Sequence, residues 1–207
     1  MIKSDKEMLW RPGRIFIPQG AFSGWMGGAT TVRVGLGAGA PVEQEVGALG
    51  YCGALFDTAG DELAHVMALP EDLDVAQPLF VRCHFITNSA TAADTVDWKV
   101  LYTPVTPNVT TSIDPVTALT TPIAQMAVLG TAAAYQTSPW GIIKGGVISE
   151  KAEILIFKCE LDAFAVGLTE DKFFMGAEFR YTPKRLQGPD GMGISARPTL
   201  AMLGKAY

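Results

Sequence analysis

A strand pattern that occurs twice constrains the fold of this chain more than any other feature. LFVRCHF at 79–85 matches LIFKCEL at 155–161, and Tyr-Thr-Pro follows each copy, at 102–104 and 181–183. Each copy reads as a strand, a polar connection with Thr and Asp, and a second strand, which predicts a hairpin. Two such hairpins predict a folded-over sandwich of the jelly-roll kind. Two unrelated amphipathic hairpins would look alike too, but they lead to the same fold class.

The rest of the chain is also typical of an all-β protein. Short runs rich in Val, Ile, Phe, Tyr and Thr alternate with Gly, Pro and Asn. The clearest predicted strands are 78–87, 95–103, 153–164 and 173–182, and weaker candidates are 14–18, 31–36, 47–56, 63–69, 127–135 and 142–148. One short helix is predicted within 115–126, with Asp114 as its N-cap and Pro115 at its first position.

Alternation within the strands predicts which side chains form the core. In strand 95–103, Trp98 is in phase with Val96 and Val100 and is therefore expected in the core. In strand 78–87, the expected core face is Leu79, Val81, Cys83 and Phe85, and the opposite face is Phe80, Arg82, His84 and Ile86. His84 is accordingly expected to be exposed or to lie in an interface.

Composition limits the function classes. The 207 residues suit one domain, and 48% of them are hydrophobic while 18% are charged, which argues against disorder. A net charge of −5 argues against a nucleic-acid partner. The best apolar stretch, 122–135, is too short for a membrane span, and the first residues lack the apolar segment of a signal peptide. An apolar, weakly charged chain of this kind is expected to bury surface in an oligomer or larger assembly.

The two ends differ from the predicted sandwich domain at 14–187. We expect an N-terminal arm at 1–13 and a C-terminal arm at 188–207, both lying on a neighbouring subunit, because they combine breakers or charges with apolar side chains. Tryptophans in loops are either interface anchors or ligand platforms. The predicted partner contacts are Trp10, Arg11, Trp25, Trp140, Met192, Ile194, Leu200, Met202 and Leu203.

Catalytic and cofactor motifs are not found. Cys52, Cys83 and Cys159 lack metal-ligand spacing and are expected to be buried free thiols. His65 would share a helical face with Asp61, but a strand fits the segment as well. Glu160 and Asp162 share a strand face and are expected to be solvated. We therefore predict no enzyme activity, no metal and no cofactor, and a jelly-roll enzyme using His65 or Glu160 is the least favoured alternative.

The two hairpins, LFVRCHFITNSATAADTVDWKVLYTP and ILIFKCELDAFAVGLTEDKFFMGAEFRYTP, are followed by Arg185-Leu186 and an apolar tail. Over about 78–186 this arrangement resembles jelly-roll virion proteins of tailed bacteriophages, most of all capsid decoration (cement) proteins. The resemblance implies a homotrimer on the capsid surface, made in the host cytoplasm, that binds the major capsid protein and stabilises the shell. It carries over no catalytic residues.

A second function stays open from the sequence. A tail-associated or receptor-binding module of the same fold would bind a glycan through Trp25 or Trp140. Both functions share one expected architecture, an all-β, jelly-roll-like antiparallel β-sandwich with extended N- and C-terminal arms.

Overall fold

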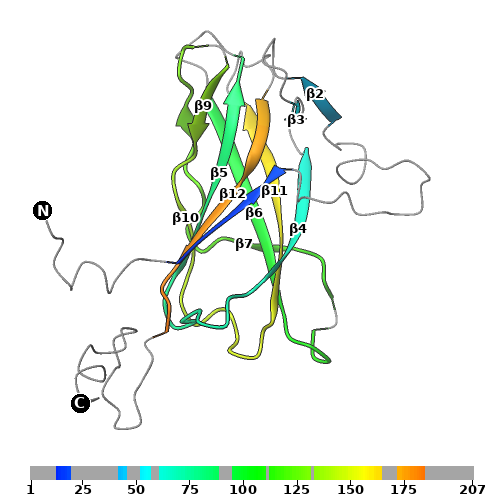
Figure 1. The fold of residues 1–207 in the computed structure, drawn as a ribbon, viewed down its shortest axis with the longest axis vertical. Helices are drawn as coiled ribbons and strands as arrows, with labels where there is room; N and C mark the ends of the chain where they lie inside the picture. The colour runs from blue at the N-terminus through cyan, green and yellow to red at the C-terminus, as the bar shows by residue number, and fades with distance from the viewer. Residues whose placement is uncertain are drawn as a thin grey trace, which may run out of the picture.

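The chain is a two-layer antiparallel β-sandwich (Figure 1). In this computed structural model the described residues are 13–19, 42–45, 52–56, 61–88, 95–110, 112–131, 133–164 and 172–184. Within these ranges the regular secondary structure is β-strand, and no helix is long and apolar enough to cross a membrane. The predicted fold class of an all-β sandwich is therefore confirmed.

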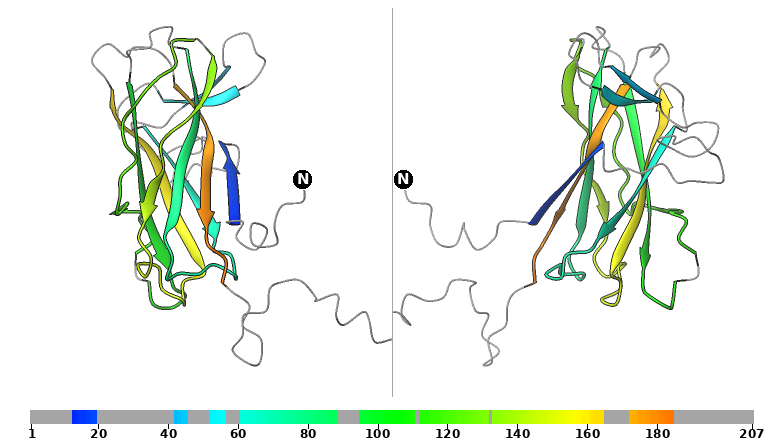
Figure 2. Two further views of the ribbon diagram at one scale, coloured as in Figure 1. Left: turned by 90° about the vertical axis from the view of Figure 1, so that its left-hand side faces the viewer. Right: turned by 45° about the vertical axis from the view of Figure 1, so that its right-hand side comes forward.

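The sheet called here sheet A contains seven of the described strands. They are β1 (Gly13–Pro18), β2 (Val42–Glu45), β3 (Cys52–Phe56), β5 (Leu79–Thr87), β9 (Ala134–Thr137), β10 (Gly141–Ile143) and β12 (Lys172–Tyr181). β12 pairs with β5, with β3 and, along its other half, with β1. Figure 2 shows β1 (blue) running alongside β12 (orange) on the outside of this layer.

The second sheet, sheet B, contains five described strands. They are β4 (Glu62–Ala68), β6 (Thr95–Val105), β7 (Thr117–Ala118), β8 (Met126–Ala127) and β11 (Ile154–Phe164). β11 lies between β4 and β6, and its pairing with β6 is the longest in the molecule's described part.

The two copies of the repeated pattern are not hairpins. β5 lies in sheet A while β6 lies in sheet B, and the second copy is divided in the opposite order, with β11 in sheet B and β12 in sheet A. Each copy therefore crosses from one layer to the other, and the copies pair with each other, β5 with β12 and β6 with β11. Both halves of the chain contribute strands to both sheets, but the prediction of local hairpins is wrong. Strand alternation fixes faces, not pairing partners.

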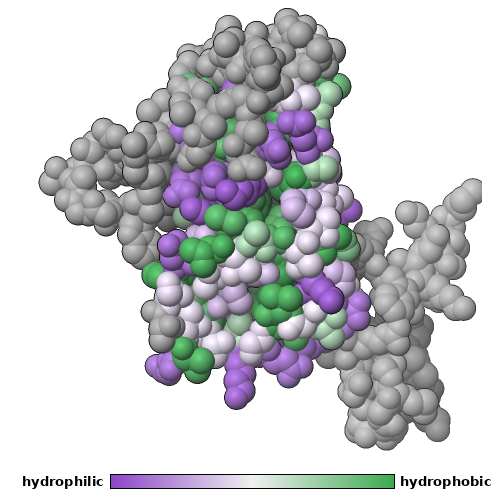
Figure 3. All heavy atoms as spheres, turned by 180° about the vertical axis from the view of Figure 1, so that it is seen from behind, coloured by the Kyte–Doolittle hydropathy of each residue, from purple (hydrophilic) through white to green (hydrophobic). Residues whose placement is uncertain are grey.

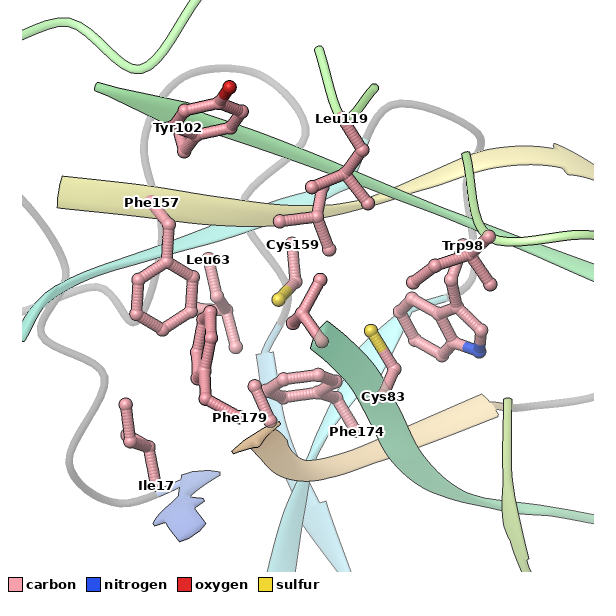
Figure 4. Packing of buried hydrophobic residues seen from close by; sticks show 14 of the residues in the cluster. Ile17, Leu63, Cys83, Trp98, Tyr102, Leu119, Phe157, Cys159, Phe174 and Phe179 are labelled. Carbon is pink, nitrogen blue, oxygen red and sulfur yellow. The ribbon is translucent and has the colours of Figure 1, made fainter. Parts of the chain in front are cut away.

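The core forms between the sheets as the alternation predicted (Figure 4). The expected core face of β5 is at most 3% exposed, and Trp98 on β6 is 1% exposed. Trp98 packs against Phe56, Phe85 and Phe174 at ring-centroid distances of 5.2–5.6 Å. The matched cysteines of the repeat, Cys83 and Cys159, are buried free thiols that enter the core from opposite sheets. Burial raises the pKa of Cys83 well above its ordinary value, with Cys159 beside it acting in the same direction.

Several local predictions need correction. The segment 115–126 is not helical, because its Val116, Thr117 and Thr120 favour extended backbone and Thr117–Ala118 pairs with β6. The predicted strand 127–135 is not continuous, because β8 ends at Ala127 and β9 begins at Ala134. The predicted strand 142–148 is shorter than expected, because β10 ends at Ile143. β2 was not predicted. Candidate strand 31–36 lies outside the described residues, as do the predicted C-terminal arm 188–207 and all of the predicted N-terminal arm 1–13 except Gly13, which begins β1.

Candidate functional site

The outer face of sheet A gathers charged and aromatic side chains from three paired strands. The β1–β12 register sets Arg14 beside Arg180 and Phe16 beside Glu178. The β12–β5 register sets Glu178 beside Arg82. Because side chains alternate along a strand, these residues share the face opposite the core. We call Arg14, Arg82, His84, Glu178 and Arg180 the Glu178 cluster.

Glu178 lies at the centre of this cluster with its side chain fully buried. Its Oε1 lies 2.7 Å from Arg14 Nε and 3.1 Å from Arg180 Nε. Its Oε2 lies 2.7 Å from Arg82 Nη2 and 2.9 Å from Arg82 Nε, a pairing that uses two nitrogens of one guanidinium. One carboxylate therefore orients three arginines.

The charge state of Glu178 follows from these contacts. Burial acts to raise the pKa of Glu178, but hydrogen bonds from Arg82 and Arg180 and the charges of Arg82 and Arg14 outweigh it. The pKa falls from its ordinary 4.5 to about 2. Glu178 is therefore ionised across the physiological range.

His84 connects the cluster to a tyrosine. Its Nε2 lies 3.0 Å from Glu178 Oε2, and its Nδ1 contacts the hydroxyl of Tyr135 on β9. Because a carboxylate only accepts hydrogen bonds, Nε2–H donates to Glu178, and in the neutral ring Nδ1 accepts from Tyr135. Burial lowers the pKa of His84, against the effect of its hydrogen bond to Glu178. His84 is therefore neutral at pH 7.

The prediction that His84 is exposed or lies in an interface is wrong, because the side chains of this same chain bury the residue to 2% exposure. Gly176 is its partner on β12 and carries no side chain. The ring of Phe16 lies next to the space that a Cβ at Gly176 would occupy, and it meets the His84 ring edge-on at 5.0 Å. His84 is thus covered by an aromatic ring from β1, which sequence alternation within β5 does not report.

Trp140, which precedes β10, completes the face. The guanidinium carbons of Arg82 and Arg180 lie 4.6 and 4.7 Å from the centre of its ring, which is cation–π distance. Phe80 packs edge-on against the same ring at 6.4 Å. Trp140 is partly exposed, whereas Phe16 is 45% and Tyr135 is 55% exposed. These three residues, Phe16, Tyr135 and Trp140, are called the aromatic rim.

Among the predicted partner contacts, only Trp140 belongs to the described residues, and it lies at this face. The other eight, Trp10, Arg11, Trp25, Met192, Ile194, Leu200, Met202 and Leu203, lie outside the described residues. Glu178 and its arginines were missed by sequence reasoning. The signal that could have found them is a single Arg at an outward position of β1, β5 and β12, which becomes informative only once those strands are known to be neighbours.

The residues considered for catalysis lie elsewhere. His65 is on β4, a strand, so Asp61 and His65 are four residues and roughly 13 Å apart, too far to share one ion. Glu160 pairs with Lys99 at 3.2 Å. Within the described residues, no three His, Cys, Asp or Glu side chains lie close enough together to hold a metal ion.

No protein-family model matches the chain, and no curated protein does. Among solved structures, it is similar to the CBM36-1 domain of a multidomain xylanase from the hindgut metagenome of Trinervitermes trinervoides. The two share 9% sequence identity with a TM-score of 0.42, over 81% of this chain and 96% of that one. A function for this chain therefore has to be inferred from its own surface.

Proposed function

We propose that this chain is a non-enzymatic binding module that recognises a carbohydrate on the outer face of sheet A. The observation that supports this proposal is the aromatic rim around the Glu178 cluster. Two rings, those of Phe16 and Tyr135, are about half exposed on a face whose polar centre is fully hydrogen-bonded.

A sugar ring offers two kinds of surface that this face complements. Its C–H groups form an apolar face that packs on an exposed aromatic ring, and its hydroxyls accept hydrogen bonds from guanidinium groups. The phenol of Tyr135 is held by His84, and the arginines are held by Glu178. Side chains that are already fixed lose little rotamer freedom when a ligand binds, which favours affinity.

The test is a glycan array probed with the full chain, followed by calorimetric titration of the glycans that bind. Phe16→Ala and Tyr135→Ala are expected to weaken binding at least about ten-fold each, because each removes a half-exposed ring from the ligand face. Trp140→Ala is expected to weaken binding as well, because Arg82 and Arg180 lose the ring that orients them.

Leu129→Ala is the matched control. Leu129 is 56% exposed, as much as Tyr135, but it belongs to the segment between β8 and β9, where its backbone N–H donates to Gln136 and not to the Glu178 cluster. Unchanged binding by the Phe16 and Tyr135 variants, or the absence of any bound glycan, would overturn the proposal.

A second candidate function is a virion structural protein, in which the chain decorates a capsid as a homotrimer and contacts the major capsid protein. The observation that favours it is a set of large apolar side chains exposed away from the Glu178 cluster. Figure 3 shows apolar side chains in separate small groups on the face seen from behind Figure 1. The exposed large apolar residues in the described part of sheet B and its connections are Val66, Val109, Ile113, Val116, Leu129 and Val147, at 43–70%.

Apolar side chains mark an interface where they join into a contiguous patch, so the oligomeric state shows whether these groups bind a partner. Size-exclusion chromatography with light scattering tests the candidate, since a trimer has three times the 22.0 kDa mass of the chain. A trimer that dissociates when Val109 and Val116 are both changed to Ser would support it. A monomer at all concentrations that also fails to bind capsid shells would contradict it.

A further inference from the structure

We infer that the carbohydrate bound at this face is acidic, carrying a carboxylate that pairs with the exposed guanidinium groups of Arg14 and Arg180. This inference rests on the proposed carbohydrate-binding function and specifies its ligand class. It follows from the charge of the Glu178 cluster, from the exposure of its arginines and from the sequence of the strands around it.

The cluster carries a surplus of positive charge. Three guanidinium groups surround one carboxylate, and His84 is neutral, so two positive charges are left without an anionic partner inside the cluster. Glu178 is the only acidic residue in the five strands β1, β5, β9, β10 and β12. The chain as a whole has a net charge of −5, so this local surplus is opposite in sign to the rest of the protein.

The surplus charge is accessible to a ligand. The Arg14 side chain is 58% exposed and the Arg180 side chain 40%, whereas Arg82 is 20% exposed and makes its bonds to Glu178 and Thr137. Arg180 contacts Glu178 through Nε, so that bond does not use the two terminal nitrogens of its guanidinium. A planar guanidinium that presents two nitrogens fits a carboxylate with two parallel hydrogen bonds.

The arrangement also places the charge next to the rings. Arg14 and Phe16 project from the same strand two residues apart, so a ligand that stacks on Phe16 reaches Arg14 within one sugar unit. A uronic acid has both parts, a ring with a C–H face and a carboxylate attached to that ring. A neutral sugar would leave the two positive charges without a counter-ion.

The experiment compares each acidic sugar with its uncharged counterpart. Four-residue oligogalacturonate and oligoglucuronate, and the same oligosaccharides fully methyl-esterified, are titrated into the full chain at 50 and 300 mM NaCl. We expect the acids to bind at least about ten-fold more tightly than the esters. The affinity of the acids should fall several-fold at the higher salt concentration. Arg14→Gln is expected to weaken acid binding more than ester binding, and so to remove most of this preference.

Lys158→Gln is the matched control. It removes one cation from sheet B, where Lys158 pairs with Glu62 at 2.6 Å, and is expected to leave the preference unchanged. Arg180→Gln serves as a second variant if the first unfolds. Equal affinity for acids and esters would overturn the acidic-ligand inference and leave the carbohydrate proposal intact. No binding of either form, together with no bound glycan on the array, would overturn both.

Discussion

Replacing Glu178 by Gln tests whether the buried carboxylate holds the outer face of sheet A together. Glutamine has nearly the shape of a protonated glutamate, so the variant imitates loss of the charge. The pKa of Glu178 falls from 4.5 to about 2 in the folded chain. Each tenfold change in proton affinity is worth about 1.4 kcal/mol, so the ionised carboxylate contributes about 3 kcal/mol of stability at pH 7. Glu178→Gln is expected to lower the unfolding free energy by that amount.

Urea unfolding at pH 7 measures this difference, and for a chain of this length it corresponds to a melting temperature lower by roughly 6–12 °C. Glu160→Gln is the control. Glu160 is also paired with a cation, but Lys99 is 39% exposed and the pair is expected to be worth less than about 1 kcal/mol. A folded-state pKa below the unfolded value gives stability that is lost as pH falls from 4.5 towards 2. The gap between wild type and Glu178→Gln should therefore narrow below about pH 4.

The reasoning would be refuted if Glu178→Gln and Glu160→Gln destabilised the chain equally at pH 7. If Glu178→Gln does not fold at all, the wild type supplies the measurement, because its own stability must fall through the same acid range.

Three further predictions concern neighbouring residues. The pKa of His84 is lowered in the folded chain, so unfolding takes up a proton below about pH 6.5 and the unfolding free energy should fall between pH 7 and 5. A pH series of urea titrations measures this fall, and His84→Asn should remove it. Gly176 has a φ of +149°, and a Cβ added there would clash with the backbone oxygen of Ile17. Gly176→Ala should therefore detach β1, which amide exchange would show as a faster rate at Ile17. Gly146→Ala, where an added Cβ meets open space, should leave that rate unchanged. Burial raises the pKa of Cys83, so a thiol reagent at pH 8 should label it only after denaturant is added, and labelling in the native state would contradict the packing.

The sequence predicted the faces of the central strands well because burial follows a period of two. In β5 and β6, every second side chain is apolar, and these side chains form the core that Trp98 and Phe85 share. The same period carries no information about which strand lies alongside. β5 and β6 were therefore expected to form a hairpin, although they belong to different sheets. The helix expected at 115–126 rested on cap signals that the β-branched residues of the segment outweighed.

The candidate site could be predicted only in part for the same reason. Trp140 stands out as a loop tryptophan and was selected as a contact residue. Glu178 and Arg82 are 96 residues apart and look like ordinary solvated charges in their own strands. Their role depends on the register of β12 with β5 and on Arg14 from β1. The burial of His84 depends on Phe16 and on the missing side chain of Gly176, which are long-range features of the same kind.

The most direct test of the central claim is an NMR titration of the ¹⁵N-labelled chain with the acidic oligosaccharide. The account predicts that the side-chain Nε–H signals of Arg14 and Arg180 shift together with the backbone amides of Phe16 and Tyr135. Shifts confined to sheet B, around β4, β6 and β11, or an unchanged spectrum at millimolar ligand, would contradict it.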